Sequence, residues 1–242
     1  MSDLVIHVHV CTHNEEKFLP YFIKHYKKIT PFIFVHDQNS TDNTVDIAKR
    51  NGCVVDTWGN NNIDELYLLE RKYNSYKESS DKADFVFIVD TDELLFHENI
   101  VEKLKNLKES GIKVPYVSGY DMYYENFNYG TDKLSDIKYG VPSKPYSKRA
   151  IIAGGFDKID YEVGCHVLNY PVPDDNQIED CIVLCHYKWI NFDFIAERHK
   201  YFATRLSQNN IDKQWGIQYV FPHEKMINDY SSMKKDLVQI FT

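Results

Sequence analysis

The 242-residue sequence lacks the features that mark several classes of protein. It has no basic excess: 28 Lys and Arg stand against 36 Asp and Glu, a net charge of −8, whereas a general nucleic-acid binder carries a basic face. No run approaches the ~18 apolar residues of a membrane span. No repeat, low-complexity segment or linker interrupts the chain, so we expect one domain over residues 1–242. An anionic ligand must be met locally, by a metal ion or a few lysines and arginines.

Cysteine pairs with metal-ligand spacing are also missing. The five cysteines are an odd number without a C-x-x-C pair: Cys11, Cys53, Cys165, Cys181 and Cys185. With no signal peptide at the start, this pattern predicts reduced thiols in a cytoplasmic protein, with peripheral contact at the cytoplasmic face of a membrane left open. Cys181 and Cys185 fall on one face of an expected strand, which favours packing over zinc binding.

What the first 112 residues do contain is a regular alternation of strand and helix patterns. The expected strands cover 4–10, 32–36, 53–57 and 85–89; the expected helices begin near 14–17 and 63 and also include 45–48 and 100–107. Such alternation is typical of an α/β fold with a mostly parallel sheet flanked by helices. Pro20 is tolerated only in the first turn of its helix, and Gly52 suits a helix end.

The pattern becomes irregular after Gly111. We expect a longer strand at 114–125, an aperiodic segment at 126–147, short strands near 149–153, 163–168 and 181–187, a helix at 193–206 and a tail helix at 224–241. The single domain therefore divides into two functional halves, at about 1–112 and 113–242.

Three polar turns follow the first, second and fourth expected strands: THNEE, DQNSTDNT and DTDE. The carboxyl ends of neighbouring parallel strands meet at one edge of a sheet, so the three turns would line one crevice. Thr12, Asn14, Asp37 and Asn39 can hydrogen-bond a base and a ribose. Any one turn is weak evidence, because helices often begin with such capping residues. All three in this order predict a nucleotide site.

The third turn combines a buried strand with clustered acids. Residues 85–89 are apolar and lead directly into Asp90, Asp92 and Glu93. Two carboxylates one residue apart repel unless a positive group lies between them, and a divalent cation with oxygen ligands is the natural candidate. The alternative is a solvated turn with a helix beginning at Asp92 or Glu93, where acids suit the helix dipole.

These motifs resemble those of family 2 glycosyltransferases over about the first 110 residues. CTHNEEKFLPYFIKHY is similar to the family's TxNEExxL opening, VHDQNSTDNTVDIAKRNG to its DxxSxDxT…A segment, and FIVDTDELL to its DxD strand. The resemblance implies a GT-A (Rossmann-like) fold, with a donor-binding N-terminal half and an acceptor-side C-terminal half. It also implies a metal-dependent enzyme that moves a sugar from a nucleotide-diphosphate sugar to a hydroxyl of a glycan, lipid-linked glycan or protein, with inversion.

The turns and the resemblance together give the expected roles of individual residues. The expected metal ligands are Asp90 and Asp92, holding Mn²⁺ or Mg²⁺ on the donor diphosphate. The expected donor contacts are Thr12, Asn14, Glu15, Asp37, Asn39, Asp90 and Thr91. Arg71, on the helix before the DxD strand, fits a phosphate or nucleoside contact and fits a solvated helix residue equally well.

The second half resembles the family less. GGFDKIDYEVG is similar to the GGFD…ED segment that in many members supplies the catalytic carboxylate, but no Glu-Asp pair follows at the usual place. The base stays open among Asp157, Glu162 and Asp180. CHYKWINFDFIAERHKYF resembles a subset of small glycosyltransferases in which a His-Tyr pair ends a late strand. His186 is therefore a candidate third metal ligand, which would favour Mn²⁺, and Lys188 would lie near the diphosphate.

The segment HVHVCTH offers a different set of histidines, His7, His9 and His13. His7 and His9 lie within a run otherwise typical of a sheet core, so we expect packed or hydrogen-bonded side chains rather than a metal site. His13 could touch the donor. Two other functions stay open: a haloacid-dehalogenase-like phosphatase, whose DxDxT loop FIVDTDEL resembles in part, and a non-catalytic nucleotide-sugar-binding protein.

Overall fold

Two five-stranded sheets form the framework of the computed structural model, which describes residues 4–171 and 178–242, with the backbone alone at 178–181. The first sheet has the order β3 (Val54–Thr57), β2 (Phe32–Asp37), β1 (Ile6–Thr12), β4 (Phe85–Asp90) and β8 (Ile151–Ala153). Its first four strands are parallel, and β8 pairs antiparallel with β4. The predicted fold class, an α/β fold with a mostly parallel sheet flanked by helices, is confirmed.

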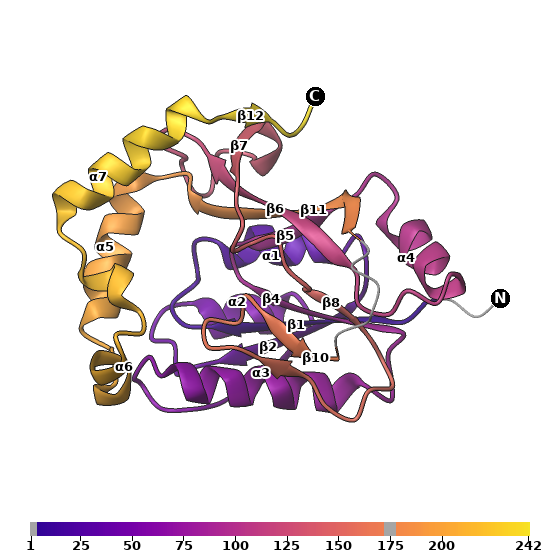
Figure 1. Ribbon diagram of the computed structural model, residues 1–242. Coiled ribbons are helices and arrows are strands. Elements are labelled where there is room, and N and C mark those ends of the chain that lie inside the picture. The colour runs from indigo at the N-terminus through magenta and orange to yellow at the C-terminus, as the bar shows by residue number, and fades with distance from the viewer. Residues whose placement is uncertain (1–3, 172–177) are drawn as a thin grey trace.

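Three helices of the first half cover the two faces of this sheet: α1 (Leu19–Tyr26), α2 (Thr44–Arg50) and α3 (Glu65–Ser79). The fourth, α4 (Ile100–Glu109), lies to one side and adds its apolar residues to the main core (Figure 1). Alternate residues of β1 point to opposite faces: Val8 and Val10 enter the main core with α1, whereas His7 and His9 contact Ser79 of α3. Figure 1 shows α3 running along the lower face of the first sheet.

The second sheet is built mainly by the second half of the chain. Its order is β12 (Val238–Gln239), β7 (Tyr139–Pro142), β6 (Tyr116–Tyr123), β11 (Ile178–Trp189) and β5 (Glu93–Phe96), and a separate pair joins β9 (Asp160–Tyr161) to β10 (Leu168–Tyr170). The main core fills the space between the two sheets and α1, with Phe22, Leu94 and Leu184 among its fully buried members.

The remaining helices follow β11. They are α5 (Phe192–Ala203), α6 (Gln208–Lys213) and α7 (His223–Ser232), with short 3₁₀ turns at η1 (Leu134–Asp136), η2 (Ile217–Val220) and η3 (Met233–Lys235). In Figure 1 α5, α6 and α7 stack along one side of the molecule, beside the ends of both sheets. No helix within the described ranges is long and apolar enough to cross a bilayer.

Several expected boundaries are wrong, each for a local reason. The alternative of a helix beginning at Asp92 or Glu93 is wrong, because the chain enters strand β5 at Glu93 and packs Leu94 and Leu95 into the core. The tail helix ends at Ser232, and the last residues instead form β12 against β7. The expected strand at 163–168 begins only at Leu168, because Gly164 and Cys165 form a turn with positive φ.

The predicted roles of Pro20 in α1 and of Gly52 after α2 agree with the structure. Helix α1 begins at Leu19, later than expected, and Pro20 does lie in its first turn. Gly52 follows the end of α2 with φ of +71°, which confirms its predicted place at the helix end.

Candidate active site

A cavity of about 260 Å³ lies at the carboxyl ends of the parallel strands. Its walls come from the turns after β1, β2, β3 and β4, from β11, and from α3 and α5. Seven of the predicted site residues line it: Thr12, Glu15, Asp90, Thr91, Asp92, His186 and Lys188. The strand ends therefore meet at one crevice, as the order of the polar turns predicts.

His186 is the residue that joins the second half of the chain to the DTD turn. Strand β11 lies between β5 and β6, so His186 has Glu93 as its neighbour on one side and Asp121 on the other. Its Nε2 lies 3.6 Å from Asp92 Oδ2, and its Nδ1 lies 2.6 Å from Asp121 Oδ1. The ring stacks on Tyr146, with the centroids 3.7 Å apart. Both nitrogens and one face of the imidazole are thus positioned.

The charges around His186 reinforce one another. Burial alone would lower the pKa of His186, but Asp92 and Asp121 outweigh it and raise that pKa to about 9. Burial would raise the pKa of Asp92, but His186 and then Arg198 hold it below its usual range. Asp92 therefore remains an anion at the cavity, where 21% of its side chain is exposed.

Asp90 occupies a different environment from Asp92. Its side chain is 43% exposed, and its Oδ1 pairs with the buried Lys72 of α3 at 2.9 Å. Its backbone N–H donates to Glu93 Oε2 at 3.0 Å, and Glu93 forms a 2.6 Å ion pair with Lys148 in which both side chains are buried. Two buried lysines, Lys72 and Lys148, thus pair with acids of this turn on the side that faces the core, while Asp90 and Asp92 line the cavity on the other side.

Glu15 faces a cation rather than empty space. Both of its carboxylate oxygens accept hydrogen bonds from Arg198 on α5. Burial raises the pKa of Glu15 to about 7, with Arg198 opposing that rise and Asp92 adding to it. Arg198 also lines the cavity. The predicted nucleoside contact of Glu15 remains a proposal, and in the structure this carboxylate orients an arginine.

Asn14, Asp37 and Asn39 lie in the turns but not among the residues that line the cavity. Asp37 accepts hydrogen bonds from Thr12 Oγ1 at 3.3 Å and from the Ser40 N–H at 2.8 Å. Asn14 accepts from the Thr41 N–H at 2.8 Å. Asn14 and Asn39 adopt left-handed backbone conformations, with φ of 53° and 54°. These residues tie the first two turns together.

Two predicted donor contacts, Asp37 and Arg71, do not reach the site, but the residue that follows each of them in the chain does. Gln38, directly after Asp37, lines the cavity and accepts from Arg205 Nη2 at 3.0 Å. Arg71 does not line the cavity, because it bonds to Asp56 and Glu78. Its neighbour Lys72 faces Asp90 instead. Successive side chains of a helix or strand point in different directions. The sequence therefore did not show which of Asp37 and Gln38, or of Arg71 and Lys72, points toward the site.

Other residues of the site escaped prediction. They are Trp58 at the end of β3, Asp121, Tyr146, Lys148, Arg198 and Tyr219. The basic residues on the helix after the His-Tyr pair were the available signal for Arg198. Asp121 had no signal, because the pairing of β6 with β11 brings it to His186. Tyr146 had none either, because it lies in the segment after β7 and reaches His186 by stacking of the two rings.

Two of the three candidates for the catalytic base, Asp157 and Glu162, are not brought to the cavity. Asp157 is exposed and accepts from the Tyr170 hydroxyl at 3.1 Å, and Glu162 is exposed as well. The side chain of Asp180 lies outside those that the structure describes. A different carboxylate, Glu65 at the start of α3, lines the cavity, and its Oε2 has no hydrogen-bond partner within the described part of the chain.

A second, larger cavity of about 940 Å³ lies beside α1. Several lysines line it: Lys17, Lys24, Lys28, Lys133 and Lys138. None of the predicted site residues whose side chains the structure describes contributes to it. Because the acidic cluster opens only into the smaller cavity, we place the candidate active site there.

Comparisons with known proteins give a distant structural likeness. No family model and no curated protein matches the sequence. Residues 1–349 of TarS from S. aureus are 14% identical, with a TM-score of 0.44 over 84% of this chain and 65% of that one. Glucosyl-3-phosphoglycerate synthase from Mycobacterium tuberculosis, in complex with Mn²⁺, UDP and glucosyl-3-phosphoglycerate, is 20% identical, with a TM-score of 0.35 over 48% of this chain and 43% of that one.

A cytidylyltransferase from Leptospira borgpetersenii is 15% identical, with a TM-score of 0.36 over 50% of this chain and 57% of that one. The chain spans less than two thirds of the length of each of these three proteins. At such identities and TM-scores the likeness assigns neither an activity nor a substrate.

Proposed function

We propose that this chain is a metal-dependent glycosyltransferase. Its donor would be a nucleotide-diphosphate sugar, and its acceptor a hydroxyl group of a carbohydrate or glycoconjugate. The supporting observation is the pairing of Asp92 with His186 beside Asp90, at the point where the parallel strands open into a cavity. This arrangement combines a cation site with space for an anionic ligand, in a protein whose net charge is −8.

The residues present fit a divalent cation. Ligand atoms that are neighbours around an octahedral ion, with bonds of about 2.0–2.2 Å, lie about 3 Å apart. Asp92 Oδ2 and His186 Nε2 are 3.6 Å apart, so a small inward movement would place both on one ion. Asp121 accepts from Nδ1 of the same imidazole, as an outer partner of a metal-binding histidine should.

The donor set also favours one ion over another. Lys72 holds Asp90 Oδ1, so Asp90 would contribute its second oxygen or a water-mediated contact. An imidazole among oxygen ligands suits Mn²⁺ better than Mg²⁺, which prefers oxygen alone. When bound, the cation would act as a Lewis acid that stabilises negative charge on the leaving diphosphate.

The sheet edge has the length that a nucleotide diphosphate requires. From β3 to β4 there are three strand spacings, or about 14 Å at ~4.8 Å each. Trp58 and Gln38 lie at the β3 and β2 end and offer an aromatic ring and an amide to a nucleoside. Arg198 and Lys188 lie with Asp92 near the other end and can balance the diphosphate charge.

Glu65 is our proposal for the base that accepts the proton of the acceptor hydroxyl. It lines the cavity, and burial raises its pKa above the ordinary range of a glutamate, with Lys72 opposing that rise. A base whose pKa lies closer to the working pH transfers protons more effectively in both directions. Inversion at the sugar requires such a base, and the expected candidates Asp157 and Glu162 are turned to solvent.

The test is an Asp92→Asn substitution, which preserves size and removes the charge. Calorimetric titration of a panel of nucleoside diphosphates, with and without Mn²⁺, should show metal-dependent binding to the wild type and its loss in the variant. The exposed Asp81→Asn is the matched control and should bind like the wild type. Unchanged Mn²⁺-dependent binding to Asp92→Asn would contradict the proposal.

Turnover separates an enzyme from a binding protein. The wild type should hydrolyse or transfer sugar from one of the nucleotide sugars that it binds, in the presence of Mn²⁺. Glu65→Gln should retain binding of the nucleoside diphosphate and lose turnover. If the wild type binds a nucleotide sugar tightly but never cleaves it, with any acceptor offered, the chain is a non-catalytic binder.

A further inference from the structure

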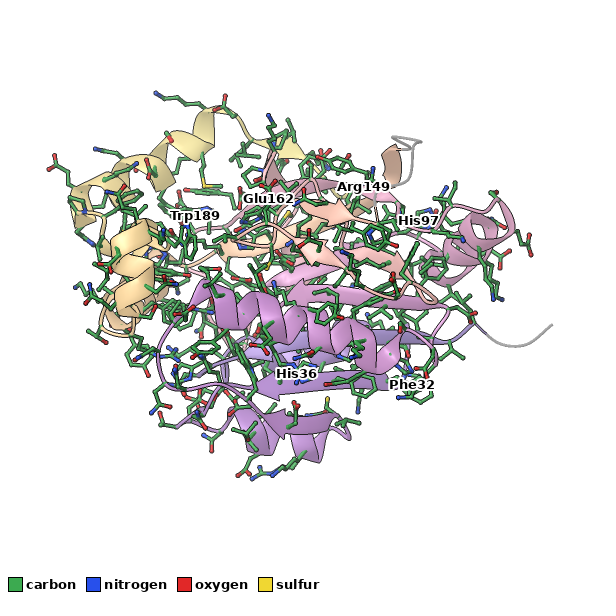
Figure 2. The ribbon with its side chains drawn as sticks, turned by 60° about the horizontal axis from the view of Figure 1, so that its bottom comes forward. Phe32, His36, His97, Arg149, Glu162 and Trp189 are labelled. Carbon is green, nitrogen blue, oxygen red and sulfur yellow. The ribbon has the colours of Figure 1, made fainter. Side chains whose placement is uncertain are left out.

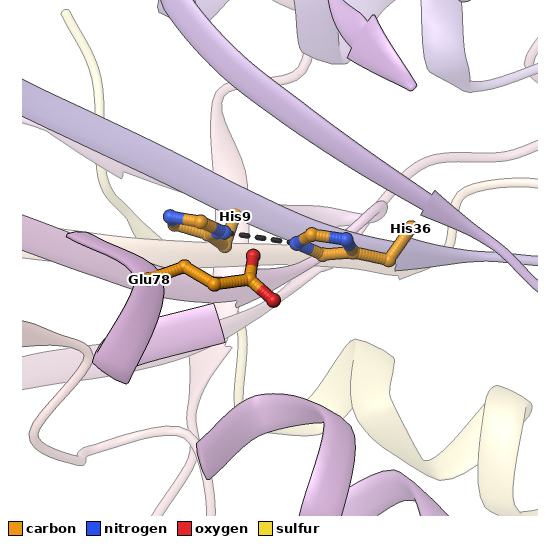
Figure 3. A group of neighbouring side chains, drawn as sticks. All are labelled: His9, His36 and Glu78. Atoms are coloured by element: carbon orange, nitrogen blue, oxygen red, sulfur yellow. Dashed lines mark hydrogen bonds between the residues drawn. The ribbon is translucent and has the colours of Figure 1, made fainter. Parts of the chain in front are cut away.

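A second cluster of histidines and carboxylates lies away from the cavity, between the first sheet and α3. His9 on β1, His36 on β2 and Glu78 on α3 each offer a potential ligand atom, and these atoms all lie within 4.8 Å of one another. Both histidines are 2% exposed. Figure 3 shows the two rings edge to edge, with the Glu78 carboxylate turned toward the gap between them.

The cluster belongs to a longer chain of hydrogen bonds. His36 Nδ1 lies 2.5 Å from Asp56 Oδ1, and His36 Nε2 lies 2.8 Å from His9 Nδ1. His9 Nε2 lies 2.7 Å from Ser79 Oγ, which in turn lies 2.7 Å from His7 Nδ1. The expectation that His7 and His9 are packed and hydrogen-bonded is confirmed. The ligand geometry at His9 and His36 nevertheless goes beyond packing.

We propose that His9 Nδ1, His36 Nε2 and Glu78 bind a zinc ion. Zn²⁺ takes imidazole nitrogens and carboxylate oxygens at about 2.0–2.2 Å, usually in tetrahedral geometry, so its ligand atoms lie about 3.3 Å apart. The two nitrogens are 2.8 Å apart and point at each other, with the ring centroids 5.2 Å apart, so each ring must also turn until its lone pair meets the ion. Glu78 is the exposed member and has the freedom to close the remaining gap. A water molecule completes four ligands.

The surrounding groups support each ligand. Asp56 accepts from His36 Nδ1, which leaves the lone pair of Nε2 directed at the metal. When His9 gives Nδ1 to the metal, its proton moves to Nε2, where Ser79 Oγ accepts it. Arg71 donates to Glu78 Oε1 at 2.6 Å and to Asp56 Oδ2 at 3.3 Å, so it binds one oxygen of each carboxylate and leaves Glu78 Oε2 for the ion.

The site joins three elements of the fold. A zinc ion here would connect β1, β2 and α3, whereas none of its three ligands lines either of the cavities described above. Helix α3 also carries Lys72, which holds Asp90, and its first turn forms a wall of the active-site cavity. The ion would therefore clamp α3 to the sheet and has no part in sugar transfer.

The experiment must separate this site from the DTD turn. In the full chain carrying Asp90→Asn and Asp92→Asn, zinc binding is measured by calorimetry with Zn²⁺ alone, and the melting temperature is recorded with and without Zn²⁺. Into this background we introduce Glu78→Gln and, as the matched control, Glu70→Gln, an exposed carboxylate on the same helix. Both glutamates are exposed, so neither change should prevent folding.

We expect one zinc per chain in the Asp90→Asn, Asp92→Asn background, with a melting temperature that rises on addition of Zn²⁺. Glu78→Gln should weaken this binding by about tenfold or more, and Glu70→Gln should not. Co²⁺ in place of Zn²⁺ should give the intense visible absorption of four-coordinate cobalt, which Glu78→Gln alters. Equal zinc affinity with Glu78→Gln and Glu70→Gln would overturn the proposal. So would a background protein that binds no zinc.

Discussion

The two histidine clusters of this protein contain similar side chains in opposite electrostatic environments. His186 lies between the carboxylates of Asp92 and Asp121, which raise its pKa to about 9 in spite of burial. His9 and His36 lie against each other, and burial, followed by neighbouring cations and imidazoles, lowers their pKa values. Burial alone therefore does not decide the charge of an imidazole here. The balance of all neighbouring charges decides it: two carboxylates outweigh burial at His186, whereas burial and Arg71 outweigh the Asp56 carboxylate at His36.

The clusters also differ in what lies in front of them. His186 and Asp92 line a cavity at the strand ends, whereas His9 and His36 are enclosed by the sheet and α3. Figure 2 places His36 and Phe32 toward opposite ends of β2, with His36 at the end that leads toward the cavity. A cluster that lines a cavity has space for a substrate beside it. A cluster enclosed between a sheet and a helix lacks that space, and we expect it to contribute to stability.

The largest expected effect comes from the buried ion pair beneath the acidic turn. Lys148→Met should lower the free energy of unfolding by about 3–5 kcal/mol, because it leaves the Glu93 carboxylate buried without its cation. Chemical denaturation measures the change. The double variant Lys148→Met with Glu93→Gln should recover much of the loss. If the double variant is less stable than Lys148→Met alone, charge burial is not the cause.

A smaller effect, on metal affinity, tests the ligand role of His186. His186→Ala should weaken Mn²⁺ binding about 10- to 100-fold, the scale at which even outer partners of a metal matter. His166→Ala is the matched control, since His166 lies in edge contact with Tyr146 but does not line the cavity. A His186→Ala protein that melts at a lower temperature but keeps a wild-type Mn²⁺ titration would make His186 a structural residue.

The smallest expected effect uses a histidine outside both clusters. Burial lowers the pKa of His25 from 6.5 to about 4, although its bond to the Leu95 carbonyl oxygen opposes the shift. The unfolded chain therefore takes up this proton first as the pH falls below about 6.5. His25 should contribute a loss of about 1–2 kcal/mol in unfolding free energy between pH 7 and pH 5.

His25→Gln measures that contribution by its absence. Stability curves against denaturant, recorded at several pH values, should fall less steeply with acidification for this variant than for the wild type. Identical slopes would show that a group other than His25 is responsible for the acid sensitivity. The result measures how far burial lowers the pKa of an imidazole that has no carboxylate nearby. It can then be compared with the pKa of His186, which two carboxylates raise.

The sequence predicted the first half of the fold because its signals are local. Apolar runs such as Phe85–Val89 and helix signals such as Pro20 and Gly52 act within a few residues, and the elements formed where expected. The second half was harder. Strand β5 depends on pairing with β11, and β12 on pairing with β7, so their register is set by residues far away in the chain.

The same distinction applies to the candidate site. The three turns converge as expected, because parallel strands place their ends together. Which side chain of a turn reaches the cavity was not predictable at single-residue level, as Asp37 and Gln38 illustrate. Partners such as Asp121 and Tyr146 come from strand pairing and ring stacking, and no local pattern indicates them.

The contacts that complete the cavity are among the longest in the chain. Glu15 and Arg198 are 183 positions apart, and His13 and Tyr201 are 188 apart. Closing such long loops carries an entropic cost before any contact is made, so contacts of this kind form late in folding. The parallel strands, α1 and the three ligands of the proposed zinc site are all made before α5, whereas the cavity is complete only once α5 has been made. In a growing chain, a ligand of the cavity would therefore bind later than the zinc ion.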